Sequence, residues 1–276
     1  MILIADSGST RTTWCLAGEP DIFFETEGYN PYFVDRNYII TSLQRSLPPS
    51  VVPDLIKEIY FYSAGSADTA YVLRDVLTVV FPGAACSVED DTLAAARALL
   101  GHEPGFAAIL GTGSNTCIYD GRRIVHNIDS LGFVLGDEGS GGAMGKKLIG
   151  DFIREIMPAD LRAIFSDTYR LSANELIDHV YNKPLANRFC AGFSKFLYEH
   201  IGTEYAQRVV RSSFDELFAN LVTRYPGYDK YAFNCVGSIG YYFQGILRDV
   251  ARDHGMKPGR ILSSPIEELV AFHKGM

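Results

Sequence analysis

The sequence predicts an α/β protein made of two related lobes, the second of which is enlarged by helices. Strand-like segments alternate with helical ones along most of the 276 residues, which is typical of α/β layers. A strand–glycine–strand pattern occurs twice, around Gly8 and around Gly113. The range 130–225 is mainly helical in its periodicity and falls within the second copy. The length itself fits two domains or one large domain.

Composition excludes several classes of protein. Lys and Arg number 25 against 33 Asp and Glu, so the net charge of -8 disfavours nucleic acid as a partner. The five cysteines are isolated, with no CxxC pair that would indicate a zinc or redox site. The start of the chain does not resemble a signal peptide, and the apolar runs are too short for a membrane helix. We therefore expect a cytoplasmic protein that binds no membrane.

The first repeated pattern is a β-hairpin, predicted over residues 4–16 and again over 109–119. Each copy has an apolar strand, a turn of Gly, Ser and Thr, and a second strand rich in β-branched or aromatic residues. Such tips present backbone N–H groups and hydroxyls that can bind phosphate oxygens without basic side chains. Asp6 ends the first strand just before its tip, where a carboxylate could hold hydrated Mg²⁺. An ordinary tight turn is the alternative for each tip taken alone.

A second pair of segments supports a duplication. Residues 58–66 and 231–238 each form an apolar strand ending in glycine, and each precedes a helix containing Leu-Arg-Asp-Val. Both pairs occur in the same order, although chance similarity between short segments remains the alternative. The second copy then carries an insertion at about 130–225. Its predicted helices cover 143–155, 173–181, 185–201 and 204–225, punctuated by Pro158, Pro184 and Pro226.

Two strand–helix junctions carry candidate site residues. Asp90 and Asp91 precede the alanine-rich helix at 93–100, where an Asp can be an N-cap or a general base for a substrate hydroxyl. Gly237 and Ser238 end an apolar strand and open a helix over 240–252. That helix start could bind the α-phosphate of a nucleotide or let adenine approach the backbone, or it could be an ordinary N-terminus.

The densest glycine cluster lies at 132–142. It contains Asp137 and Glu138, two carboxylates that could accept hydrogen bonds from a polyol such as a sugar. A flexible acidic loop is the alternative interpretation of this segment.

Three of these motifs resemble a known family. DSGSTRTTW near the start, ILGTGSN at 109–115 and GDEGSG at 136–141 resemble the N-acetylglucosamine kinase family. More broadly, they resemble the BadF/BadG-type ATPases of the sugar kinase, heat-shock-protein-70 and actin superfamily. The resemblance covers nearly the whole chain. It implies two ribonuclease-H-like lobes, as in actin-like ATPases, around a central cleft that closes over MgATP and a sugar.

The resemblance also implies domain bounds and site residues. The first lobe would span 1–110, with 264–276 packing back on it, and the second 111–263. Asp91, in preference to Asp90, would be the catalytic base, and Asp6 would be the acid associated with Mg²⁺. The expected nucleotide-binding residues are Ser7, Gly8, Ser9, Thr10, Thr112, Gly113, Gly237 and Ser238. The expected sugar-binding residues are Asn30, Ser114, Asn115, Asp137 and Glu138.

Two departures from the family pattern qualify this expectation. Ser130-Leu131-Gly132 stands where the family often has Gly-Trp-Gly, which affects the expected shape of the acyl pocket. The sequence also has no cysteine pair like the one that binds the cluster in the iron–sulfur activator ATPases, so that relative is disfavoured.

The predicted function is ATP-dependent phosphorylation of an amino sugar, N-acetylglucosamine to its 6-phosphate, by in-line transfer with Asp91 as the base. Glucosamine and N-acetylmuramic acid are alternative substrates, because a single acetyl or lactyl contact depends on pocket shape. A non-catalytic sensor that binds ATP or sugar is the alternative of a different class. The sequence does not determine the oligomeric state, and a homodimer is one possibility.

Overall fold

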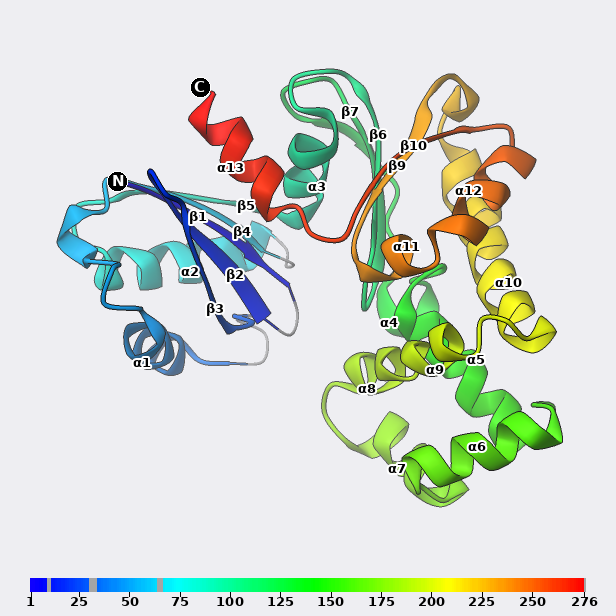
Figure 1. Cartoon of the computed structure of the whole chain (residues 1–276). Coiled ribbons are helices and arrows are strands. Elements are labelled where there is room, and N and C mark those ends of the chain that lie inside the picture. The colour runs from blue at the N-terminus through cyan, green and yellow to red at the C-terminus, as the bar shows by residue number, and fades with distance from the viewer. Residues whose placement is uncertain (9–10, 30–33, 64–66, 276) are drawn as a thin grey trace. The chain divides into compact units, whose positions relative to one another are not determined.

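The computed structural model describes residues 1–8, 11–29, 34–63 and 67–275. The chain forms two compact units, each with its own five-stranded sheet (Figure 1). Unit 1 comprises the described residues up to Pro104, the turn 120–124 and the residues from Ser264 onward. Unit 2 comprises 105–119 and 125–263. The predicted α/β class with two sheets is confirmed.

The sheet of unit 1 mixes parallel and antiparallel pairs in the order β3-β2-β1-β4-β5. Its strands are β1 (Ile2–Ser7), β2 (Arg11–Ala17), β3 (Ile22–Glu27), β4 (Glu58–Ser63) and β5 (Ala85–Asp90). β1 and β2 form the predicted antiparallel hairpin, whereas β1, β4 and β5 run parallel to one another. The carboxyl ends of these three strands therefore lie at one edge of the sheet.

Helices cover both faces of this sheet. The apolar core on one face contains Leu3 and Phe61, together with residues of α1 (Arg36–Ser46) and α2 (Ala67–Val80). Successive strand residues point to opposite faces. The other face accordingly packs against α3 (Asp91–Leu100) and α13 (Ile266–Lys274).

The sheet of unit 2 has the same plan, with the order β10-β9-β6-β7-β8. Its strands are β6 (Gly105–Leu110), β7 (Ser114–Tyr119), β8 (Ile124–Asn127), β9 (Ala232–Val236) and β10 (Lys257–Leu262). β6 and β7 form the second predicted hairpin, and β6 pairs in parallel with β9 just as β1 pairs with β4. The two sheets thus share one strand order, as a duplication predicts.

Most of the helices of unit 2 lie between β8 and β9 (Figure 1). They are α4 (Gly132–Leu135), α5 (Gly141–Ile153), α6 (Ala159–Tyr169), α7 (Ala173–Asn182), α8 (Ala186–Gly192), α9 (Ser194–Glu199) and α10 (Glu204–Asn220). The sequence did not predict α6, and the single helix expected over 185–201 is divided at Phe193 into α8 and α9. That these helices are an insertion relative to unit 1 stays a prediction.

The observed boundary between the two units differs slightly from the expected boundary between the lobes. Unit 2 begins at Gly105 rather than after residue 110, because β6 pairs with β7 and β9 and so belongs to the second sheet. In unit 1, α13 packs on α3, β1 and β2.

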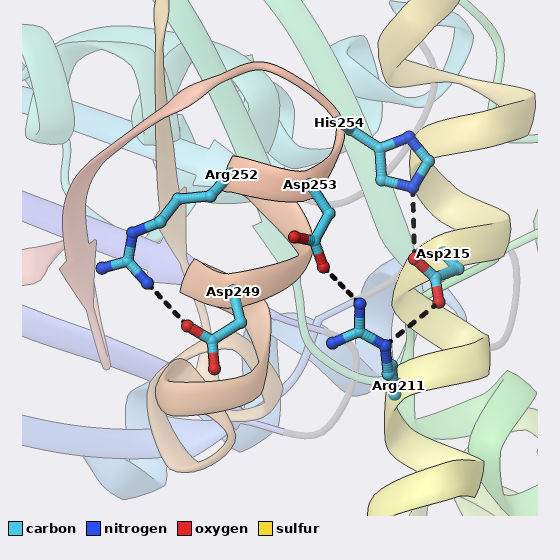
Figure 2. A network of polar contacts seen from close by, with 6 residues as sticks. All are labelled: Arg211, Asp215, Asp249, Arg252, Asp253 and His254. Carbon is cyan, nitrogen blue, oxygen red and sulfur yellow. Dashed lines mark hydrogen bonds and ion pairs between the residues drawn. The ribbon is translucent and has the colours of Figure 1, made fainter.

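The helix expected over 240–252 is present as α11 (Ser238–Tyr242) and α12 (Gln244–Asp253). Figure 2 shows how charged side chains join α12 to α10. Arg211 pairs with Asp253 and, at 3.7 Å, with Asp215, and His254 Nε2 lies 3.1 Å from the same Asp215. Among the helices of the described ranges, none is both long and apolar enough to cross a membrane.

Candidate active site

Two predicted acids meet at the carboxyl edge of the sheet in unit 1. Asp6 lies near the end of β1, and Asp91 begins α3 directly after β5. β4 separates the two strands, and Ser7, Ser63 and Asp90 share one row of the parallel register. Because neighbouring strands are about 4.8 Å apart, the two carboxylates are within electrostatic reach of each other.

Asp90 and Asp91 have different roles in α3. Asp90 is the N-cap, and its side chain accepts a hydrogen bond of 2.7 Å from the backbone N–H of Thr92. This satisfies one of the unpaired donors at the start of the helix. Asp91 has helical backbone geometry, and its carboxylate accepts a long contact of 3.4 Å from Thr92 Oγ1 instead of capping the helix. The capping role therefore falls to Asp90 and leaves the Asp91 carboxylate available for a ligand.

Burial raises the proton affinity of both Asp6 and Asp91. Desolvation raises the pKa of Asp6 to about 6, with the charge of Arg11 opposing part of the increase. Desolvation raises the pKa of Asp91 well above its ordinary value, and the negative charges of Asp90 and Asp6 raise it further. This edge of the sheet therefore favours a bound cation or proton.

The first hairpin tip is held by polar contacts on both sides. The backbone N–H of Gly8 donates to the carbonyl of Arg11 at 3.0 Å. The buried hydroxyls of Ser7 and Thr12 lie 2.7 Å apart, and Thr12 donates to the carbonyl of Glu27 at 3.0 Å. These bonds fix the strand ends that flank the tip. Three predicted site residues, Ser9, Thr10 and Asn30, lie outside the described residues.

In unit 2, the second hairpin tip is bonded directly to the glycine cluster. The carbonyls of Gly111 and Thr112 accept hydrogen bonds from the first two N–H groups of α5, at Gly141 (2.8 Å) and Gly142 (3.0 Å). A Cβ at position 142 would lie 2.9 Å from the carbonyl oxygen of Thr112, so the approach requires glycine. The motifs GTGSN and GDEGSG are therefore held directly against each other in unit 2.

Asp137 connects the same two motifs through its side chain. It is buried, and its carboxylate accepts a hydrogen bond of 3.1 Å from the N–H of Ser114. Its φ of 57° is unusual for a residue with a side chain, which is a common feature of functional sites. Desolvation raises its pKa, opposed by the N–H of Ser114 and by Lys146. Beside it, the buried hydroxyl of Ser114 has no hydrogen-bond partner among the residues that the structure describes.

Two other predicted sugar ligands use their oxygens within unit 2. Asn115 Oδ1 accepts from the N–H of Thr116 and from Asn127 Nδ2, each at 2.9 Å. Glu138 accepts from Asn220 Nδ2 at 2.8 Å. Both side chains are therefore already oriented, whereas Ser114 and Asp137 keep polar capacity for a ligand.

Gly237 brings the end of β9 against the second tip. Its φ is 123°, and a Cβ there would lie 2.4 Å from the carbonyl oxygen of Leu110. The next residue, Ser238, lies at the edge of a cavity of about 460 Å³ between α9 and α11. This volume is within the range of small-molecule sites. The cavity is lined by Ser194, Lys195, Tyr198, Glu199, Ser238, Ile239, Tyr242 and Phe243.

Most of these lining residues were not predicted from the sequence. Tyr198 and Lys195 read only as part of a helix, because their place beside Ser238 depends on how α9 packs. An aromatic run that ends in Tyr242 and Phe243 begins three residues after Ser238, and it was a signal in the sequence that could have located this cavity. The predicted residues thus form two groups, one at the acidic edge of unit 1 and one around the second tip of unit 2.

Several solved structures are similar to this chain over nearly its whole length. A candidate N-acetylglucosamine kinase from Porphyromonas gingivalis is 40% identical, with a TM-score of 0.95 over 100% of this chain and 99% of that one. A candidate N-acetylglucosamine kinase from Chromobacterium violaceum has a TM-score of 0.76 at 16% identity, covering 98% of each chain. A ROK family glucokinase from Streptomyces griseus, solved with glucose and AMPPNP, has a TM-score of 0.54 at 15% identity, covering 99% of this chain and 98% of that one.

The second and third similarities show a shared fold, that of the sugar kinases and actin-like ATPases, as predicted. The sequence matches no protein-family model, and no curated protein sequence matches it. The first similarity, at 40% identity over the full length, shows the family. The chain belongs to the N-acetylglucosamine kinase family.

Proposed function

We propose that this protein phosphorylates N-acetylglucosamine at O6 with ATP as the phosphoryl donor. The observation that carries the proposal is the state of Asp91, a carboxylate free of the capping role and raised in pKa at the edge that also holds Asp6. The family membership supports the same reaction, because the relative with 40% identity is described as a kinase of this sugar.

Asp91 acts as the general base in this proposal. A base needs a pKa near the working pH, so that it is ionised when substrate binds and can still accept a proton in the transition state. Burial and the charges of Asp90 and Asp6 move the pKa of Asp91 in that direction. The sugar O6 attacks the γ-phosphorus of ATP while its proton passes to the Asp91 carboxylate. ADP departs on the opposite side of the phosphorus.

The residues around Asp6 fit a magnesium ion better than a metal held by protein alone. Asp6 is a partly buried carboxylate whose pKa is raised by desolvation, and the charge of Arg11 offsets only part of that increase. Within the described ranges, no group of three or more His, Cys, Asp or Glu residues could hold a metal. Mg²⁺ is typically bound by one or two carboxylates, water and substrate phosphates, and when bound it would neutralise charge on the phosphate oxygens. Asp6 would hold it, directly or through water.

The two hairpin tips and the cavity beside Ser238 fit the nucleotide. Backbone N–H groups of Gly-, Ser- and Thr-rich tips can donate hydrogen bonds to phosphate oxygens without basic side chains, which suits a chain with a net charge of -8. Tyr198 and Tyr242, with ring centroids 5.1 Å apart, form an aromatic wall beside Ser238 on which a purine base can pack. We assign this cavity to the nucleoside.

Asp137 and Ser114 are the proposed sugar ligands. Asp137 accepts hydrogen bonds from Ser114 N–H and from the Ser130 side chain, and the remaining lone pairs of its carboxylate could accept from a sugar hydroxyl. Ser114 Oγ is buried without a partner within the described residues and can donate or accept.

The test is an assay of sugar-dependent ADP formation with N-acetylglucosamine, glucosamine and N-acetylmuramic acid. We expect turnover with wild-type protein, the highest kcat/KM with N-acetylglucosamine, and loss of turnover in Asp91→Ala. A higher kcat/KM for either other sugar would reassign the substrate. Tight binding of ATP or sugar without product would indicate a sensor, and full turnover in Asp91→Ala would refute the role of the base.

A further inference from the structure

The helix that begins with Asp91 has an unusually smooth buried face. Four of the buried residues of α3 are alanines, namely Ala94, Ala95, Ala96 and Ala98. Alanine side chains form shallow ridges, so they allow close packing but resist sliding along the helix axis less than larger side chains do. The position of Asp91 along that axis therefore depends on other contacts of the helix.

Arg97 provides such a contact with the sheet. Its Nη1 donates a hydrogen bond of 2.7 Å to the hydroxyl of Tyr62 on β4, and its guanidinium lies over the ring of Phe272 on α13, 5.3 Å from the centroid. Tyr62 is opposite Asp6 in the register of β1 and β4. A single hydrogen bond thus joins the helix of Asp91 to the strand position beside Asp6.

The hydroxyl of Tyr62 is held from a second side by His273. The Tyr62 oxygen and His273 Nε2 lie 2.8 Å apart. Because a guanidinium can only donate, the Tyr62 oxygen accepts from Arg97. Burial and the charge of Arg97 lower the pKa of His273 to about 4, so the imidazole that holds the same oxygen is neutral near pH 7.

The His273 ring is itself fixed by packing. It stacks on the ring of Tyr60, with centroids 3.8 Å apart and planes at 19°. His273 is only 3% exposed, so the chain of contacts Arg97–Tyr62–His273 ends in a rigid part of unit 1. All of its members belong to the same compact unit as Asp6 and Asp91.

We propose that Arg97 and Tyr62 are positioning residues for Asp91: they fix α3 along its axis and thereby set the place of the Asp91 carboxylate relative to Asp6. This inference rests on the proposed function of Asp91. A displacement of the base by a fraction of an ångström reduces the rate of proton transfer, since a misplacement of about 1 Å can cost roughly 100-fold. The phosphates bind to the hairpin tips instead, so nucleotide affinity is preserved.

The test compares four variants by steady-state kinetics well below their melting temperatures. Tyr62→Phe removes the hydroxyl that both partners use, and we expect kcat to fall about 10- to 100-fold with the KM for ATP within about twofold of wild type. Arg97→Lys keeps a donor and should retain more kcat than Arg97→Met. Phe272→Leu is the matched control: it loosens the same cluster without breaking the Arg97–Tyr62 bond, so it should lower Tm and leave kcat within about twofold.

A second readout does not depend on activity. Hydrogen exchange of the segment 91–100 should accelerate in Tyr62→Phe and not in Phe272→Leu, relative to wild type. If wild type formed no ADP in response to sugar, the proposed function would be refuted. The exchange data would then still test whether the Arg97–Tyr62 bond holds α3 in place. The positioning role would be overturned if Tyr62→Phe had the same kcat and the same exchange rate of segment 91–100 as wild type. It would also be overturned if Phe272→Leu lost as much kcat as Tyr62→Phe.

Discussion

Neighbouring carboxylates in unit 1 differ in chemistry because different groups hold them. Asp90 is exposed, and its charge is stabilised by a backbone N–H of α3. Asp91, one residue later, is partly buried and experiences the negative charges of Asp90 and Asp6. The sequence alone left the choice between cap and base open at this pair, and the backbone geometry of the helix start assigns the cap to Asp90.

Replacing Asp91 should therefore stabilise the protein while it abolishes the proposed chemistry. Asp91→Asn removes a desolvated charge and its repulsion with two other acids, so we expect unfolding at a higher urea concentration at pH 7. Asp90→Asn is the comparison: Asn caps a helix as well as Asp does, and the variant removes only the repulsion between Asp90 and Asp91, so it should raise the urea midpoint less than Asp91→Asn does. A lower urea midpoint for Asp91→Asn would contradict the burial of an uncompensated charge.

Asp6 should make the stability of the nucleotide-free protein depend on pH. Its pKa is about 6 in the folded chain against an ordinary value of 3.8 for an exposed aspartate, so the unfolded state ionises first as pH rises. Stability is then fully present below about pH 4 and is lost through pH 6, by roughly 3 kcal/mol from this group. Asp6→Asn does not titrate.

Urea unfolding of both proteins from pH 4 to pH 7 checks this dependence. The free energy of unfolding of Asp6→Asn should increase relative to wild type up to about pH 6 and then level off. A difference that stays constant over this range would show that Asp6 is not desolvated.

At the scale of elements, features that depend on neighbouring residues could be predicted from the sequence, whereas features that depend on contacts between distant segments could not. The two hairpins follow from Gly, Ser and Thr between alternating strands, and both are present. Which sheet contains β6 could not be predicted in the same way, because its parallel partner β9 lies more than a hundred residues later in the chain. The cavity beside Ser238 escaped prediction for a similar reason: Tyr198 and Tyr242 come from α9 and α11, which only tertiary packing brings together.

Packing of α5 against α8 gives a prediction with an internal control. A Cβ at Gly145 would lie 1.8 Å from the backbone carbonyl oxygen of Cys190, whereas nothing lies within 4 Å of a Cβ at Gly150 on the same helix. Gly145→Ala should destabilise the protein by about 1–3 kcal/mol, since the two backbones must separate. Gly150→Ala should be stabilising by about 0.5–1 kcal/mol, through helix propensity.

Thermal unfolding of the two alanine variants separates these effects. We expect opposite shifts of Tm from the same substitution on one helix. A Tm for Gly145→Ala at or above that of wild type would show that α5 and α8 do not pack as closely as described.

At the scale of the whole molecule, the predicted residues divide between two units with one strand order. Unit 1 supplies the proposed base and the acid suited to Mg²⁺, and unit 2 supplies the second phosphate loop and the polar groups proposed for the sugar. The sequence predicted these groups because glycine and carboxylate motifs are local. It did not predict Arg97–Tyr62–His273, whose members come from β4, α3 and α13 and meet only in the fold.

The rate of sugar phosphate formation tests the central claim most directly. Wild type, Asp91→Asn and Asp90→Asn would be incubated with ATP, Mg²⁺ and N-acetylglucosamine, and the product followed by ³¹P NMR and mass spectrometry. We predict that wild type forms a 6-phosphate, that Asp90→Asn retains this activity with its pH profile shifted to lower pH, and that Asp91→Asn forms the product roughly 100- to 10,000-fold more slowly than wild type. Equal rates in wild type and Asp91→Asn, or no sugar phosphate from wild type, would contradict the account.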